Sequence, residues 1–182
     1  MTVTAFVALL RAVNVGGKTM LPMAELRTLA EGLGWVDVKT LLQSGNLVFR
    51  AEGPADALAQ TLEDAIEAHA GRRFTVLVRT PAEWSGLIAA NPYPDEARDD
   101  PSHMVVLPLR AAPSAEAQAA LRAAIRGREV FTVKGREAFF VYPDGIGDSK
   151  LTPALIDRHL GAGTGRNWNT VLKIDAALKA LG

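Results

Sequence analysis

Four short segments of this sequence concentrate polar side chains beyond what chain turns require. They are RAVNVGGK at 11–18, QSGN at 43–46, DSK at 148–150 and GTGRNWNT at 163–170. Four of the five asparagines in the chain lie inside these segments. Guanidinium, ammonium and amide groups are the donors that bind carboxylates and phosphates. The four segments therefore indicate a site for an anion, provided that the fold brings them together.

Glycines and helix ends would add backbone donors to such a site. Gly16 and Gly17 allow neighbouring N–H groups to converge, Lys18 adds charge, and the 163–165 loop precedes a predicted helix. We expect a small phosphate-bearing or carboxylate-bearing ligand in a groove lined by side chains from both halves of the chain. The candidate ligand-binding residues are Arg11, Asn14, Gly16, Gly17, Lys18, Gln43, Ser44, Asn46, Lys150, Arg166, Asn167 and Thr170.

The same segments lack the groups that several enzyme classes need. Asp148 is their only carboxylate, they contain no histidine, and the whole chain has no cysteine. Paired carboxylates for glycoside hydrolysis, a metal-ligand set and a serine triad are therefore not supplied. We expect no metal and no cofactor. Whether the chain is an enzyme stays open, and any catalysis would act by stabilising the charge of a bound anion.

A purely structural interpretation competes with ligand binding. Gly and Asn form tight turns, Asn side chains cap helices, and a buried Arg can satisfy loop carbonyls. Turn and cap roles suffice for 43–46 and for Asn169. Arg11 and Arg166 are harder to explain in this way because no turn requires an arginine.

Two other functions remain as alternatives. One is a noncatalytic interaction module, for which exposed aromatic residues on a sheet would indicate single-stranded nucleic acid. The other is a nucleoside triphosphatase, because AVNVGGKT at 12–19 fits a relaxed P-loop pattern. Neither strand VLVRT nor strand VVLPLR ends in the aspartate that would hold magnesium. We rank this function last.

Composition limits the class of protein. The 182 residues are 48% hydrophobic, with 20 basic and 20 acidic side chains, which suits one compact domain or two small halves. The neutral balance argues against a nonspecific nucleic-acid binder. The first residues lack the pattern of a signal peptide, and no apolar run is long enough to span a membrane. We expect a cytoplasmic protein without a membrane partner and leave its oligomeric state open.

Hydrophobic periodicity predicts an α+β fold of two ferredoxin-like halves. Strand, helix, strand, strand, helix, strand is the expected order in the first half, which is the split β-α-β pattern. The second half repeats this order, except that we expect a helix in place of the final strand. The predicted boundaries are 1–91 for the first half, 92–103 for a proline-rich linker and 104–182 for the diverged second half.

Three of the polar segments also carry a family resemblance. RAVNVGGK, LQSGNLVF and GTGRNWNTVLK are similar to the signature segments of the domain-of-unknown-function 1697 family of small bacterial proteins. The resemblance spans nearly the entire chain, in the same order and spacing. It implies an α+β fold of ferredoxin-like character and implies no activity.

Overall fold

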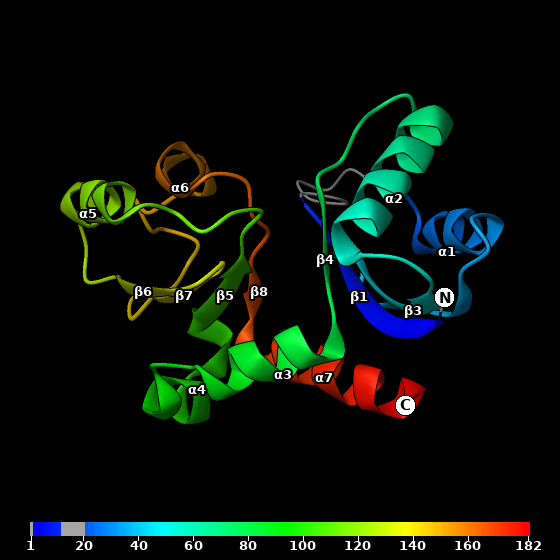
Figure 1. Cartoon of the computed structure of the whole chain (residues 1–182). Helices are drawn as coiled ribbons and strands as arrows, with labels where there is room; N and C mark the ends of the chain where they lie inside the picture. Colours follow the sequence, from blue (N-terminus) through cyan, green and yellow to red (C-terminus); the bar gives the residue numbers. More distant parts are fainter. Residues whose placement is uncertain (1, 12–20) are drawn as a thin grey trace. The chain divides into compact units, whose positions relative to one another are not determined.

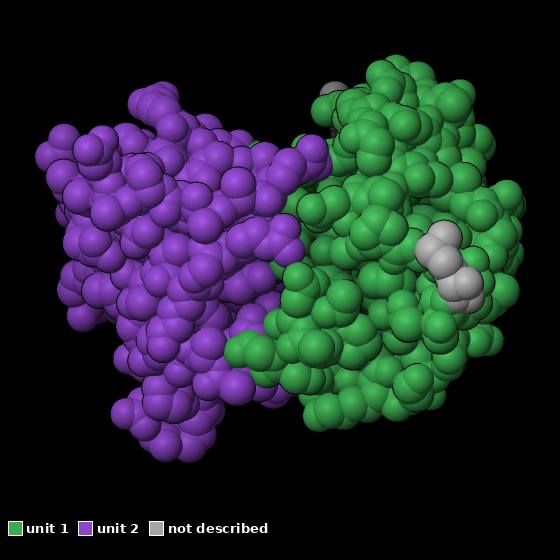
Figure 2. Space-filling view, in the orientation of Figure 1, with its two compact units in different colours: residues 1–86, 173–182 green, residues 87–172 purple. Residues whose placement is uncertain are grey.

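A computed structural model describes residues 2–11 and 21–182 of the chain. It divides into two compact units, formed by residues 1–86 with 173–182 and by residues 87–172 (Figure 2). We call these unit 1 and unit 2. Each contains a four-stranded antiparallel sheet with helices alongside (Figure 1). The predicted α+β fold with two halves is therefore confirmed.

Unit 1 follows the predicted order of elements. Its sheet order is β2-β3-β1-β4, and β1 pairs antiparallel with both β3 and β4. Helix α2 ends at Gly71, whose φ of 68° is the left-handed conformation that favours glycine. The elements are β1 (Thr4–Leu10), α1 (Met23–Gly32), β2 (Val36–Leu41), β3 (Asn46–Ala51), α2 (Ala55–Ala70) and β4 (Val76–Arg79).

The core of unit 1 lies between its sheet and helices α1 and α2. Phe6, Ala8 and Leu10 alternate along β1 toward this side of the sheet, as the period of two in a strand requires. Leu26 of α1 and Leu62 of α2 are fully buried against them. These apolar contacts fix where β1 ends and therefore where Arg11 begins the following loop.

Unit 2 contains the second sheet, in the order β6-β7-β5-β8. The division between the units falls within α3 and α7. The expected linker at 92–103 contains two helices rather than an irregular segment, because Pro94 and Pro101 each begin one. The elements are α3 (Pro81–Ala89), α4 (Pro94–Asp99), the 3-10 helix η1 (Pro101–His103), β5 (Met104–Pro108), α5 (Ala115–Ala124), β6 (Val130–Lys134), β7 (Glu137–Val141), α6 (Pro153–Leu160), β8 (Arg166–Asn167) and α7 (Trp168–Leu181).

One prediction for the second half was wrong. The fourth strand is not replaced by a helix, because β8 pairs antiparallel with β5 before α7 begins. Strand β8 has two residues, which is too short for a periodic apolar pattern to reveal it. The β6–β7 hairpin turns at Gly135-Arg136, since Lys134 pairs with Glu137.

Each sheet has the same pattern of backbone hydrogen bonds at the end of a central strand, β1 in unit 1 and β5 in unit 2. In unit 1 the Leu10 N–H donates to the Gly45 carbonyl, and in unit 2 the Leu109 N–H donates to the Arg136 carbonyl, both at 2.8 Å. The next residues repeat the correspondence, since Arg11 N–H donates to Thr75 and Arg110 N–H to Ala162, both at 2.9 Å. Arg11 and Arg110 therefore occupy equivalent positions in two structurally similar halves.

Candidate functional site

The first polar segment begins beside the second in unit 1. Leu10, the last residue of β1, bonds to Gly45 in the 43–46 turn, and Arg11 bonds through its N–H to Thr75 just before β4. Arg11 is partly buried at this edge of the sheet. The backbone thus brings the start of 11–18 against 43–46. The predicted site residues Asn14, Gly16, Gly17 and Lys18 lie outside the described residues.

Within the 43–46 turn, Asn46 has a structural role. Its side chain is fully buried, and its Nδ2 donates to the Leu41 carbonyl and to Ser44 Oγ, both at 2.8 Å. Gly45 adopts a φ of 83°, which explains the glycine. Gln43 and Ser44 are exposed. The turn therefore presents Gln43 and Ser44 to solvent and uses the Asn46 amide to hold its own shape.

Arg166 in β8 is buried and bonded to its own segment. Only 7% of its surface is exposed, and its guanidinium donates to Thr164 Oγ1 at 2.7 Å and to the Gly165 carbonyl at 2.8 Å. Burial lowers the pKa of Arg166 to about 10 because the charged form loses hydration. These contacts match the structural interpretation of an arginine that satisfies loop carbonyls.

The glycine and asparagine that precede α7 also have partners within unit 2. A Cβ on Gly163 would lie 2.7 Å from the Pro108 carbonyl oxygen, so close packing on β5 requires a glycine there. Asn167 Oδ1 accepts the Thr170 N–H at 3.0 Å and caps the first turn of α7. Ligand binding by Arg166, Asn167 and Thr170 stays a prediction, beside a structural role that the contacts explain.

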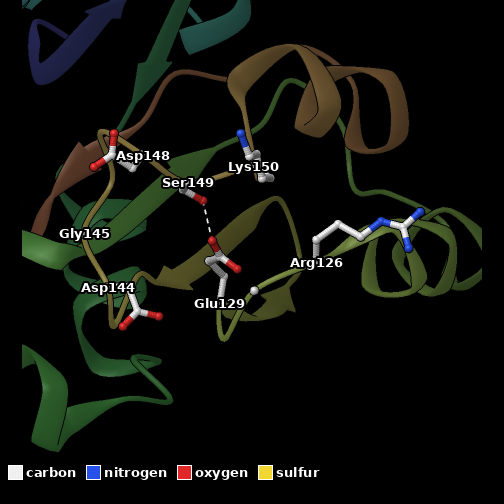
Figure 3. Close-up of a pocket in the computed structure, with 8 residues that line it drawn as sticks. Arg126, Glu129, Asp144, Gly145, Asp148, Ser149 and Lys150 are labelled. Atoms are coloured by element: carbon white, nitrogen blue, oxygen red, sulfur yellow. Dashed lines mark hydrogen bonds between the residues drawn. The ribbon is translucent and has the colours of Figure 1, made fainter.

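The third polar segment lines a pocket in unit 2 (Figure 3). Its volume is about 200 Å³. It lies between the loop that joins α5 to β6 and the loop that joins β7 to α6. Of the predicted ligand-binding residues only Lys150 is among those that form it. The lining residues are Arg126, Gly127, Glu129, Asp144, Gly145, Asp148, Ser149 and Lys150.

Glu129 is one of the lining residues of this pocket that were not predicted from the sequence. Ser149 Oγ accepts the Leu151 N–H at 3.1 Å and donates to Glu129 Oε1, which fixes the carboxylate (Figure 3). The buried Oε2 of Glu129 has no hydrogen-bond partner among the described residues. In the sequence Glu129 is one charged residue of a charged stretch between α5 and β6, so no pattern distinguishes it.

Tyr142 directly follows β7 in unit 2. Its side chain is buried, and burial together with the charge of Glu129 raises the pKa of the Tyr142 phenol to about 12. Burial is the larger cause because the phenolate would lose hydration. The phenol therefore stays protonated at neutral pH.

Segments 148–150 and 163–165 lie toward opposite ends of β5. Ser149 bonds to Glu129, which directly precedes β6, and the first residue of β6 pairs through Val141 with Met104 at the start of β5. Gly163 instead forms a bridge with Leu109 just beyond the end of β5. Strand β8 then runs along β5, so that Asn167 pairs with Val105 next to Met104. The predicted grouping of 148–150 with 163–170 stays a prediction.

Other classes of site find no support in the described part of the chain. Among residues 2–11 and 21–182, no group of three or more His, Cys, Asp or Glu side chains could hold a metal ion. The strand aromatics are buried rather than arranged as an exposed stacking surface, as expected for core residues: Phe6, Phe49, Phe139, Phe140 and Tyr142. No helix in this described part is long and apolar enough to cross a bilayer.

Comparison with known proteins gives a family and a fold. A family model described as "Protein of unknown function (DUF1697)" matches residues 3–139, which include the segments 11–18 and 43–46. The chain is similar in structure to the conserved bacterial protein SP0830 from Streptococcus pneumoniae, with a TM-score of 0.76 and 22% sequence identity. That likeness covers 97% of this chain and 99% of the other, and it shows the fold alone. No curated protein matches the chain.

Proposed function

The chain belongs to the DUF1697 family of proteins of unknown function, and we propose that it binds a small molecule through a phosphate or carboxylate group at the end of β1. The proposal places Arg11, Gln43 and Ser44 at the ligand. Asn14, Gly16, Gly17 and Lys18 are the sequence-predicted partners of these residues. We also propose that both halves are ferredoxin-like, which the sheet orders β2-β3-β1-β4 and β6-β7-β5-β8 support.

One observation carries the proposal: a backbone hydrogen bond at the end of β1 holds the start of segment 11–18 next to the turn 43–46. The Leu10 N–H bonds to Gly45, and the Arg11 N–H bonds to Thr75, so Arg11 leaves the sheet beside the 43–46 turn. Both hydrogen bonds use backbone atoms, so the sheet sets the position of the Arg11 backbone.

The side chains at this edge suit an anion better than a cation. A guanidinium presents a planar fork of N–H donors that matches carboxylate and phosphate oxygens. Gln43 and Ser44 are exposed at the same turn and can donate as neutral groups. Segments 11–18 and 43–46 contain no Asp or Glu, so no carboxylate within them would repel an anion or serve as a base. The role supported best is binding, and any chemistry would rely on charge stabilisation.

The test compares two arginines at equivalent positions. Phosphate, sulfate, acetate and a nucleoside monophosphate would be titrated into the 15N-labelled full chain, with chloride at matched ionic strength as the reference. We expect saturable shifts of the Leu10, Gly45 and Thr75 amides. Arg11→Ala should weaken binding about tenfold, the worth of a hydrogen bond to a charged group.

Arg110→Ala is the matched control. Arg110 follows β5 as Arg11 follows β1, with the same pattern of backbone hydrogen bonds, but it has no QSGN turn beside it. Its substitution should leave the affinity unchanged. Equal losses in both variants would show a general effect of charge, and no saturable shift with any of the anions would contradict the proposal.

A further inference from the structure

We infer that Asn46 is a positioning residue of the proposed anion site, which fixes the Ser44 hydroxyl as a hydrogen-bond donor to an ionised oxygen of the ligand. This role rests on the proposed function and deepens it. It gives a fully buried amide a task beyond the shape of its own turn. It also narrows the ligand to one whose oxygen at Ser44 accepts and does not donate, as the oxygens of an ionised phosphate or carboxylate do.

One nitrogen of the Asn46 side chain serves two acceptors. Its Nδ2 lies 2.8 Å from the Leu41 carbonyl oxygen and 2.8 Å from Ser44 Oγ. The Leu41 carbonyl can only accept, so the atom that bonds to it must be the NH2 group of the amide. Each of the two bonds then uses one of the two NH2 protons. Ser44 Oγ is therefore the acceptor of its bond with Asn46.

This bond settles which part of the Ser44 hydroxyl faces a ligand. A hydroxyl has one O–H donor and two acceptor lone pairs. The bond from Asn46 occupies a lone pair of Ser44 Oγ and does not use the hydroxyl proton. Ser44 is exposed, so an anion at the turn can accept that proton. A hydroxyl that already accepts one hydrogen bond also donates more strongly, because hydrogen bonds in a chain polarise one another.

The amide of Asn46 is held in one orientation. Asn46 pairs with Leu41 across the hairpin and with Leu9 of β1 in the sheet, and its side chain is fully buried. A flip of the amide would leave the Leu41 carbonyl without this donor, which costs free energy in a buried place. The donor role of Ser44 is therefore set before a ligand arrives, and this reduces the cost of ordering the site on binding.

The same turn contains a strained residue. Leu42 is exposed and adopts a φ of 60°, which is uncommon for a bulky side chain. Gly45 adopts a similar conformation, with a φ of 83°, at no such cost. The bond from Asn46 to the Leu41 carbonyl holds the residue directly before Leu42. Strain that the surroundings enforce in this way is typical of ligand-binding sites, and a glycine at 42 would connect the two strands without it.

A nucleophilic role for Ser44 is a poorer match. A serine nucleophile needs a neighbouring base that takes its proton. The group bonded to Ser44 Oγ is an N–H donor of Asn46, and segments 11–18 and 43–46 contain no His, Asp or Glu. The contacts of Ser44 thus suit donation to a bound anion.

The experiment follows the side-chain NH2 group of Asn46 while phosphate and acetate are each titrated into the 15N-labelled full chain, with chloride at matched ionic strength as the reference. We expect a saturable shift of this resonance, with the same dissociation constant as the shifts of the Leu10 and Gly45 backbone amides. Asn91 is the matched control: its Nδ2 donates to the Tyr93 carbonyl in unit 2, and its NH2 resonance should stay unchanged. Backbone shifts without a shift of the Asn46 NH2 group would overturn the inference.

Ser44→Ala removes the hydroxyl and keeps the buried amide. We expect the affinity for the anion to fall about fivefold, the worth of one hydrogen bond. The shift of the Asn46 NH2 group on titration should disappear, while the backbone amides still respond. Ser44→Thr keeps a hydroxyl and should retain both the affinity and the shift. A shift of the Asn46 NH2 group that persists in Ser44→Ala would show that the amide responds by another route and would contradict the assigned role.

A double-mutant cycle separates positioning from a purely structural role. Asn46→Ala should weaken anion binding about fivefold in the wild-type chain but by less than about 1.5-fold in Ser44→Ala, because its effect passes through the hydroxyl. Equal losses in both backgrounds would mean a general distortion of the turn and would refute positioning. If Asn46→Ala does not fold, the NH2 shifts of the wild-type chain and of Ser44→Ala decide the question.

Failure of this inference and failure of the proposed function give different results. No saturable shift with either anion in the wild-type chain would contradict the proposed site and the role of Asn46 together. Anion binding that is lost in Arg11→Ala but does not move the Asn46 NH2 group would leave the proposed function standing and would overturn the role of Asn46 alone.

Discussion

Arg79 and Arg166 occupy the same position in two different sheets. Arg79 of β4 pairs with Val7 of β1, and Arg166 of β8 pairs with Val106 of β5. Both arginines are buried, with 1% and 7% of their surface exposed. Val7 and Val106 each lie four residues before the equivalent arginines Arg11 and Arg110. The two halves thus repeat a buried arginine in the fourth strand as well as the backbone pattern of the central strand.

Arg166→Ala should reduce the stability of the chain. It leaves Thr164 Oγ1 and the Gly165 carbonyl without their donor, and it opens a cavity beside β5. We expect a loss of about 2–4 kcal/mol in the free energy of unfolding, measured by urea denaturation. Arg158→Ala, at an exposed site near the end of α6, should change it by less than about 0.5 kcal/mol. Equal stability of the two variants would mean that Arg166 is not a structural residue.

Gly163→Ala should destabilise the pairing of β8 with β5. Its Cβ would approach the Pro108 carbonyl oxygen to 2.7 Å and the Leu109 side chain to 2.9 Å. Because backbone cannot move aside as a long side chain can, we expect a loss of about 1–3 kcal/mol, the usual cost of overpacking. Gly147→Ala is the control, since its Cβ would meet nothing within 4 Å. Thermal unfolding of both variants checks the difference, and a neutral Gly163→Ala would refute this role.

Stability should fall at high pH because of Tyr142. The pKa of its phenol is raised to about 12 in the folded chain, whereas it is about 10 in the unfolded chain. The stabilisation is therefore complete below pH 10 and is lost as the pH rises toward 12, because only the unfolded state releases its proton in that window. A shift of this size corresponds to about 2–3 kcal/mol.

Denaturation at pH 9 and at pH 11.5 measures this loss, with Tyr142→Phe as the comparison. The variant has no phenol to ionise at this site, so its stability should fall less between the two pH values. Ultraviolet absorption during an alkaline titration supplies a second readout, in which the late-ionising phenol should be missing from the variant. An equal fall for both proteins would contradict the assignment.

The periodicity of the sequence was sufficient for most of the fold. An unbroken apolar run predicted β1, short strand-like stretches predicted β5 and β7, and helical spacing of apolar residues predicted α1, α2 and α5. Capping residues predicted helix starts, as with Ser114, whose Oγ accepts the Ala117 N–H at 3.1 Å. Strand β8 was missed because two residues cannot show a period. The helices α4 and η1 were missed because prolines at helix starts resemble those of a linker.

Less of the candidate site could be predicted. The link between 11–18 and 43–46 stays a prediction, which the hydrogen bond from the Leu10 N–H to the Gly45 carbonyl, next to Arg11, supports. Lys150 was singled out, but Glu129, which lines the same pocket, was not, because one glutamate within a charged stretch has no distinguishing pattern. The grouping of 148–150 with 163–170 stays a prediction, because Gly163 lies at the Leu109 end of β5 whereas Asn167 pairs with Val105 near the other end.

The amino-acid sequence by itself determined most of the elements, the two similar halves and the polar segments, because hydrophobic period and turn chemistry act over a few neighbouring residues. Only the tertiary structure decided which polar groups were already satisfied. Arg166, Asn46 and Asn167 bond within their own segments, while Glu129 Oε2 is buried without a partner among the described residues. Whether a donor or acceptor is satisfied depends on distances that folding sets between residues, and composition carries no record of those distances.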